Sequence, residues 1–175
     1  MRTLGLAVLV LLTGCLKSDP APPLTGPVGG EERPGLQTMV LKTLDGKEWR
    51  LSQDKGQVVL LDVWATWCEP CADSLPMYHD LLKEFGPRGF KLYGINVDAD
   101  SKVVTPFLKE LKVEIPVLVD PGAATVEGAL KVSVMPTAYL IDRQGKLRHV
   151  HDGFAEEFLP RYMKEIEELL AEKAQ

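Results

Sequence analysis

The sequence has few of the features that define several large classes of protein. Three cysteines in 175 residues are too few for a disulfide scaffold. The formal net charge of −5 argues against a nucleic-acid partner. The apolar run at residues 4–12 has nine residues, whereas a helix that crosses a bilayer needs about 20. Hydrophobic residues make up 45% of the chain, which is the composition of a globular protein with an ordinary core.

The apolar run instead fits a secretory signal, because Arg2 precedes it and the stretch LTGC (residues 12–15) ends it. LTGC resembles the bacterial lipobox, in which small residues precede a cysteine that receives a diacylglycerol group. The resemblance implies cleavage before Cys15, lipid on Cys15, and attachment to a bacterial membrane on the periplasmic side, where disulfides persist. Leu16, in place of an aspartate, favours the outer membrane. An ordinary signal peptide with a chance cysteine is the alternative.

Composition divides the chain into three parts. We predict a lipoprotein signal peptide at residues 1–14 and a lipid-anchored flexible linker at residues 15–35, where proline and glycine dominate. Residues 36–175 form the predicted folded domain. At its start, Asp45-Gly46 lies between two β-rich runs within residues 38–53, and this pattern predicts an N-terminal β-hairpin.

The rest of the domain alternates predicted strands with predicted helices. Strands are predicted at residues 57–65, 90–98, 115–120, 137–142 and 147–153. Helices are predicted at residues 71–85, 104–111, 123–131 and 156–174. This alternation predicts an α/β fold with a central mixed β-sheet flanked by helices.

Cys68 and Cys71 form a C-x-x-C pair between a predicted buried strand and a predicted helix. A zinc site would need two more ligands at suitable spacing, and the sequence has no second cysteine pair. Covalent haem attachment needs a histidine directly after the second cysteine, where this chain has Ala72. A structural disulfide across two residues would remove little chain entropy. Redox chemistry is therefore the favoured interpretation, and we expect no metal.

The two cysteines are expected to differ. Cys68 would lie at the N-terminus of a helix, where the dipole favours its thiolate. It would attack a substrate disulfide, and the more buried Cys71 would then resolve the mixed disulfide. Pro70 removes an amide donor and Glu69 adds negative charge beside Cys68. Both act against a strongly oxidising pair, so we expect mainly a reductase, with a potential nearer about −270 mV than about −120 mV.

Two further residues are candidates for the site. Asp62 interrupts an apolar run, so we expect it to be buried, with a raised pKa that suits it to take a proton from Cys71. An exposed carboxylate at the strand edge is the alternative. Pro136 directly precedes the strand predicted at residues 137–142, and a cis Met135–Pro136 bond beside the cysteines would leave the Met135 backbone to pair with substrate. A trans proline at a strand start is the alternative.

The residues discussed above lie in two stretches, LLDVWATWCEPC and MPTAYLID. Both stretches resemble the sequences of proteins with the thioredoxin fold. The N-terminal hairpin and the extra helix near residues 123–131 make the chain most similar to the membrane-anchored TlpA/ResA branch. The resemblance implies that Cys68 is the nucleophile, Cys71 the resolving thiol and Pro136 the cis proline, with Trp67 flanking the site. Many members of that branch have a glutamate where this chain has Ser74.

The resemblance also implies partners. Protein disulfides would be the substrates, a transmembrane thiol-reducing protein would supply electrons, and cytochrome c maturation would be the process served. We expect a monomer with no cofactor other than the Cys68–Cys71 disulfide.

Two alternatives belong to other classes. Cys68 and Cys71 could bind Cu(I), with His149 or His151 as a further ligand, since the alternation of these histidines places both imidazoles on one strand face. A solvent-exposed strand with two polar residues is the simpler interpretation of those histidines. A thiol peroxidase would need a threonine three residues before the nucleophile, where this chain has Ala65.

Overall fold

The structure is a computed structural model that describes residues 34–173. The predicted signal peptide, Cys15 and nearly all of the predicted linker lie outside the described residues. Within residues 34–173, no helix is long and apolar enough to cross a membrane.

One seven-stranded sheet forms the centre of the domain, in the order β2-β1-β5-β4-β3-β6-β7. The central strands β3, β4 and β5 are parallel, and the outer strands add antiparallel pairs on both sides. This arrangement confirms the predicted mixed sheet and the N-terminal hairpin. The strands are β1 (Leu41–Thr43), β2 (Glu48–Trp49), β3 (Val58–Trp64), β4 (Phe90–Asn96), β5 (Val117–Val119), β6 (Thr137–Ile141) and β7 (Leu147–Asp152).

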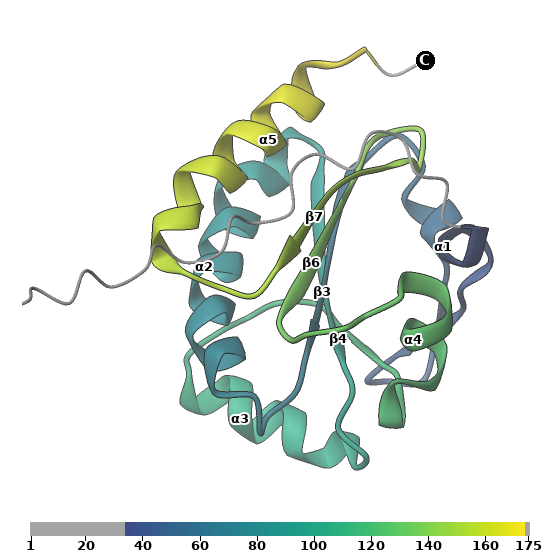
Figure 1. The fold of residues 1–175 in the computed structure, drawn as a ribbon, viewed down its shortest axis with the longest axis vertical. Coiled ribbons are helices and arrows are strands. Elements are labelled where there is room, and N and C mark those ends of the chain that lie inside the picture. Colours follow the sequence, from purple (N-terminus) through teal and green to yellow (C-terminus); the bar gives the residue numbers. More distant parts are fainter. Residues whose placement is uncertain (1–33, 174–175) are drawn as a thin grey trace, which may run out of the picture.

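Helices cover both faces of the sheet, with α2 and α5 on one face and α1 and α4 on the other (Figure 1). Side chains alternate along β3, so Val58 and Leu60 pack under α2 and α5, whereas Val59, Leu61 and Val63 belong to the opposite core. The helices are α1 (Pro34–Thr38), α2 (Glu69–Phe85), α3 (Val104–Glu110), α4 (Ala124–Leu130) and α5 (Leu159–Ala171).

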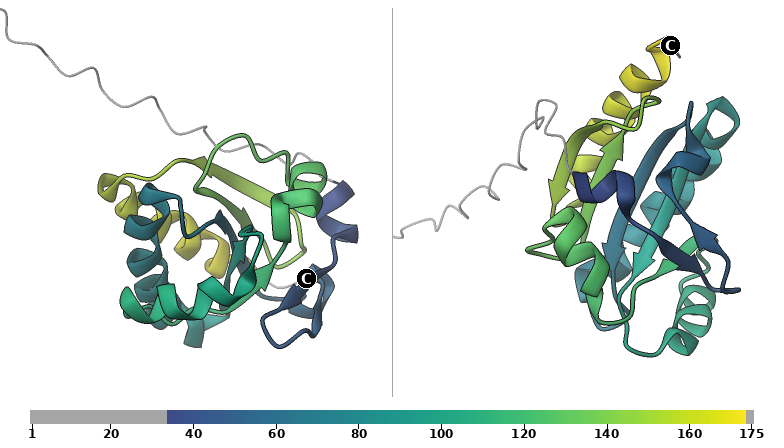
Figure 2. Two further views of the ribbon diagram at one scale, coloured as in Figure 1. Left: turned by 90° about the horizontal axis from the view of Figure 1, so that it is seen from below. Right: turned by 90° about the vertical axis from the view of Figure 1, so that its right-hand side faces the viewer.

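The first helix begins inside the predicted linker, since α1 includes Pro34 and Gly35. It packs against α4, and the two helices lie side by side in both views of Figure 2. A Cβ added at Gly35 would lie 2.5 Å from the Ala129 Cα, so only glycine permits this approach. The sequence does not reveal this contact because the two residues are distant along the chain.

The second β-rich run of the N-terminal region is shorter than predicted. Strand β2 ends at Trp49, and residues Leu51–Asp54 form a 3₁₀ helix. The Trp49 indole donates a hydrogen bond of 2.9 Å to the Asp54 carboxylate, and Leu51 is buried. These contacts stabilise the tighter turn over continued strand pairing.

Candidate active site

The junction between β3 and α2 positions the cysteine pair. Cys68 is the N-cap residue of α2, as predicted, and its amide donates to the Ala65 carbonyl at 3.2 Å. The Asp98 carboxylate, beyond the end of β4, accepts hydrogen bonds of 2.9 Å from both the amide and the hydroxyl of Thr66. Asp98 therefore fixes the loop that leads to Cys68, a role that sequence spacing does not indicate.

Cys68 and Cys71 are joined by a disulfide bond in the structure. Cys68 is 6% exposed and Cys71 is fully buried, which matches the expected asymmetry between the two sulfurs. Trp67 is 68% exposed beside Cys68, and both Glu69 and Pro70 also face solvent. A partner disulfide can therefore reach this region from the Cys68 side.

Asp62 is buried in the middle of β3, as predicted. Its register partners are Gly94 on β4 and Ala138 on β6. Neither carboxyl oxygen makes a hydrogen bond of ordinary geometry with the described residues. Burial raises the pKa of Asp62 well above its usual range, and the Tyr78 hydroxyl partly opposes this rise. The site therefore contains a carboxyl group with a strong preference for its protonated form.

Helix α2 connects Asp62 with the cysteine pair. Cys71 and Tyr78 are seven residues apart, which places them on one face of the helix, and both are fully buried. Tyr78 interacts with Asp62, and Cys71 lies about two turns earlier on the same helix. Ser74, between them, donates its hydroxyl to the Cys71 carbonyl at 3.0 Å and is satisfied within its own helix.

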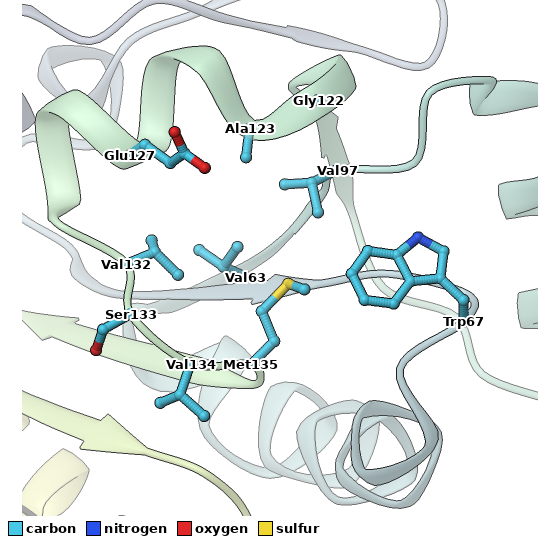
Figure 3. A pocket seen from close by; sticks show the side chains of 10 residues that line it. All are labelled: Val63, Trp67, Val97, Gly122, Ala123, Glu127, Val132, Ser133, Val134 and Met135. Carbon is cyan, nitrogen blue, oxygen red and sulfur yellow. The ribbon is translucent and has the colours of Figure 1, made fainter.

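The Met135–Pro136 peptide bond is cis. Pro136 is buried, and its carbonyl accepts a hydrogen bond of 2.8 Å from the Gly153 amide. Met135 and Trp67 line one pocket of about 440 Å³, together with Val63 and side chains of the α4 region (Figure 3). Glu127 is the one charged residue among the ten that line this pocket. The segment before β6 and the tryptophan before Cys68 thus share a largely apolar hollow.

The histidines of β7 are not on an exposed strand, which corrects the simpler interpretation above. His151 is fully buried, and its Nε2 lies 2.7 Å from a Glu165 carboxylate oxygen on α5. The His149 Nδ1 lies 3.5 Å from the other Glu165 oxygen, and burial lowers the pKa of His149. Helix α5 covers this strand face. Over residues 34–173 no group of three or more His, Cys, Asp or Glu side chains could hold a metal ion.

Comparison with known proteins places this site in a family. The model of the AhpC/TSA family matches residues 32–150, which is more than half of the chain. The chain belongs to the AhpC/TSA family. Its fold has the thioredoxin architecture expected from the sequence, and the chain is similar to proteins named for thiol-disulfide exchange.

Two of the curated relatives, both named thiol-disulfide oxidoreductase ResA, illustrate this similarity. The protein from Bacillus subtilis is 35% identical over 128 residues, covering 73% of this chain and 71% of the relative. The protein from Bacillus thuringiensis subsp. konkukian is 30% identical over 138 residues, covering 78% of each chain.

Solved structures agree with this assignment. A protein from Chlorobium tepidum, assigned as thiol:disulfide interchange protein DsbE, superimposes with a TM-score of 0.71 and is 33% identical, covering 76% of this chain and 93% of that chain. The exposed lipoprotein thioredoxin of Streptococcus pneumoniae has a TM-score of 0.64 and 33% identity, covering 75% and 98%. The chain is therefore a thiol-disulfide oxidoreductase of the ResA and DsbE type, with Cys68 and Cys71 as its cysteine pair.

Proposed function

We propose that this chain is an extracytoplasmic, lipid-anchored oxidoreductase that mainly reduces disulfides in protein substrates. The observation that carries the proposal is the asymmetric pair at the start of α2, where Cys68 keeps 6% of its surface exposed beside the exposed Trp67 and Cys71 is fully buried. The exposed Trp67 and the adjoining apolar pocket supply a surface on which a polypeptide can dock.

The reaction begins from the reduced pair. The Cys68 thiolate attacks one sulfur of the substrate disulfide, that S–S bond breaks, and one substrate thiolate leaves. Cys71 then gives up its proton and attacks the Cys68 sulfur, which breaks the mixed disulfide and releases the second substrate thiolate. The substrate gains two electrons, and the pair ends as the Cys68–Cys71 disulfide seen in the structure. An external dithiol donor, which we propose to be a transmembrane thiol-reducing protein, must restore it.

Asp62 is the proposed acceptor of the Cys71 proton. Its burial, its lack of ordinary hydrogen bonds and its raised pKa make it a base that can take a proton near neutral pH. Ser74 cannot take this role, because its hydroxyl is not basic and donates to the Cys71 carbonyl. The proton route therefore runs between α2 and the strand β3.

The residues around Cys68 support a direction of electron transfer and a place where the substrate docks. The exposed Glu69 carboxylate and the missing amide of Pro70 both disfavour a Cys68 thiolate, which supports reduction of substrates over their oxidation. The cis proline Pro136 and the Met135 backbone lie at the edge of the pocket that Trp67 also lines. We propose that an extended substrate segment pairs with Met135 there.

The location of the protein rests on the N-terminal sequence and on its relatives. LTGC at residues 12–15 supports lipid attachment at Cys15, and the similar pneumococcal protein is described as an exposed lipoprotein. The TlpA/ResA resemblance supports a role in cytochrome c maturation. Replacing Cys15 with serine should release the protein from membranes, as measured by fractionation, without changing its activity in solution.

Trapping tests the proposed roles of the cysteines. Reduced Cys71→Ser protein, mixed with a disulfide-containing protein substrate, should accumulate a mixed disulfide on Cys68, visible by non-reducing electrophoresis and mass spectrometry. Cys68→Ser protein is the matched control and should form no such adduct. Absence of the adduct with Cys71→Ser would refute these roles, and a reduction potential near about −120 mV would refute the proposed direction.

A further inference from the structure

Two tyrosines from different helices meet behind Asp62. Tyr78 on α2 and Tyr162 on α5 are both fully buried, and their hydroxyl oxygens lie 3.3 Å apart. Their rings meet edge to face with centroids 6.0 Å apart. Helical periodicity alone describes both as core residues. However, a buried tyrosine hydroxyl needs a polar partner, and these two are placed beside each other and beside a carboxyl group.

The Tyr78 hydroxyl faces two groups at once. It contacts the Tyr162 hydroxyl and it also interacts with Asp62, whose charged form it favours. Burial raises the pKa of Tyr78 well above its usual range, and the negative charge of Asp62 adds to that rise. Tyr78 therefore keeps its proton at any physiological pH and is available as a donor.

The number of available protons determines which hydroxyl donates and which accepts in these hydrogen bonds. A hydroxyl has one proton to donate and two lone pairs that accept. Neither Asp62 oxygen has a hydrogen-bond partner of ordinary geometry among the described residues, so an ionised Asp62 leaves an acceptor open to the Tyr78 proton. The Tyr78 oxygen then accepts the proton of Tyr162, and both hydroxyls are satisfied.

We propose that Tyr162 donates a hydrogen bond to Tyr78 and that Tyr78 donates one to Asp62. This chain of two hydroxyl hydrogen bonds, called the file below, stabilises the ionised carboxylate of Asp62 at the stage when Cys71 must lose its proton. The inference rests on the proposed function of Asp62 as the proton acceptor. Tyr78 and Tyr162 are positioning residues, since they act on Cys71 only through Asp62. Without them, burial alone would keep the carboxyl protonated to a higher pH.

Other charged groups lie near the far end of this file. Asp62, Ala138 and His151 are register partners across β3, β6 and β7, so their side chains share one sheet face, with His151 about 10 Å from Asp62 across two strand spacings. The His151 ring centroid is 4.3 Å from that of Tyr162.

Glu165 on α5 is the carboxylate closest to these side chains. It lies 2.7 Å from His151, 2.8 Å from the Arg161 Nε and 3.5 Å from His149. Burial would raise the pKa of Glu165, but the bonds from His151 and Arg161 outweigh burial and lower it. The group is therefore already paired, and the carboxylate of Glu165 is not a competing acceptor for the Tyr78 proton.

Direct titration of Asp62 tests the file. We would follow the ¹³C resonance of the Asp62 carboxyl in the oxidised full-length protein, where the two cysteines do not titrate, and assign it with Asp62→Asn. Tyr78→Phe should move the midpoint to higher pH, and Tyr162→Phe should move it in the same direction by less. The matched control is Tyr139→Phe, because Tyr139 is buried and donates to the Leu130 carbonyl at 3.1 Å within the opposite core.

A second arm measures the rate at which the mixed disulfide is resolved as a function of pH. Below the Asp62 midpoint, Tyr78→Phe should slow resolution roughly tenfold, as expected for loss of a charge-assisted hydrogen bond, and the rate should recover at higher pH. A uniform loss at all pH values would indicate a structural effect and would overturn the inference. So would an unmoved Asp62 midpoint in both Tyr78→Phe and Tyr162→Phe, or an equal shift in Tyr139→Phe.

Failure of the inference can be told from failure of the proposed function. If Asp62→Asn slows resolution while both tyrosine variants leave the midpoint and the rate unchanged, Asp62 is the proton acceptor and the file is refuted. If the midpoint shifts in the tyrosine variants while Asp62→Asn resolves at the wild-type rate, the file is supported and the proposed role of Asp62 is refuted.

Discussion

Asp62 and Asp142 are both buried, yet their surroundings are opposite. Asp142 lies in the turn between β6 and β7, where its carboxylate accepts hydrogen bonds of 2.9 Å from the Gln144 and Lys146 amides and lies 3.2 Å from Arg148. Asp62 lies in the central strand, where it has no bond of ordinary geometry and only the Tyr78 hydroxyl for polar company. Hydrogen-bond donors hold the Asp142 carboxylate in place, whereas the Asp62 carboxyl group lacks such donors.

The difference separates two uses of the same side chain. A carboxylate surrounded by amides and a guanidinium is stabilised as an anion and holds a turn in place. A carboxyl that lacks donors changes its protonation easily, which costs stability but suits proton transfer. Asp98 and Asp120 belong with Asp142, since Asp98 accepts hydrogen bonds from the amide and hydroxyl of Thr66 and Asp120 accepts from two amides in the first turn of α4.

The largest expected effect is on the rate of resolution. Asp62→Asn keeps the size of the side chain and removes its basicity, so resolution of the mixed disulfide near neutral pH should slow by roughly 100-fold. The first attack by Cys68 should be nearly unchanged, and rapid-quench analysis of the two steps would show this. Equal resolution rates for Asp62→Asn and wild type would remove the distinction between the two aspartates.

Asp142→Ala should produce the next effect, on stability. It leaves two turn amides without their acceptor and removes one of the two carboxylates that Arg148 contacts, so we expect the free energy of unfolding to fall by about 1–3 kcal/mol in urea titrations. Its resolution rate should match that of wild type at temperatures where both proteins are folded. A selective loss of the resolution rate would show that the turn carboxylate also serves the site.

Replacing Asp62 should raise thermal stability, whereas replacing Asp142 should lower it. Because folding raises the pKa of Asp62, its contribution to stability is full below the unfolded value of about 3.9 and is lost as pH rises through the folded value. Asp62→Asn escapes this loss. Its melting temperature should exceed that of wild type by several degrees at alkaline pH, and the gap should close in acid. A gap independent of pH would contradict a buried titrating carboxyl.

An exposed aspartate should show the smallest effect. Asp45 pairs with Lys47 at 2.6 Å on the β1–β2 turn, and hydrogen bonds from Lys47 and Thr43 lower the pKa of Asp45. Both side chains are largely exposed, and solvent screens such pairs. Asp45→Asn should therefore leave the urea midpoint within experimental error. A clear loss would mean that exposure is a poor guide to the cost of losing a carboxylate in this fold.

Local sequence was enough to predict the centre of the site. The apolar run that contains Asp62 predicts a buried strand, and the apolar residues at helical spacing after Cys71 predict a helix with Cys68 at its N-terminus; both are confirmed. The C-x-x-C pair and the proline before β6 also led to the thioredoxin fold. These features depend on neighbours within a few residues, so no tertiary information was needed to find them.

Features that join distant segments could not be predicted in this way. Tyr78 and Tyr162 are 84 residues apart, and Thr66 and Asp98 are 32 apart. The burial of His151 depends on α5, which follows β7 and folds back over it. Periodicity assigns a side chain to a face, but it does not say which polar group on another element will meet it there.

The close approach of α1 to α4 bears on the distance between the pocket and the proposed membrane anchor. The polypeptide enters the folded domain at α1, and α4 supplies Glu127 to the wall of the pocket beside Trp67. The predicted linker from Cys15 therefore leads into α1, and α1 contacts α4, which borders the proposed substrate pocket. If Cys15 carries the proposed lipid, the number of residues between Cys15 and Pro34 sets the greatest distance at which the proposed substrate pocket can work from the membrane.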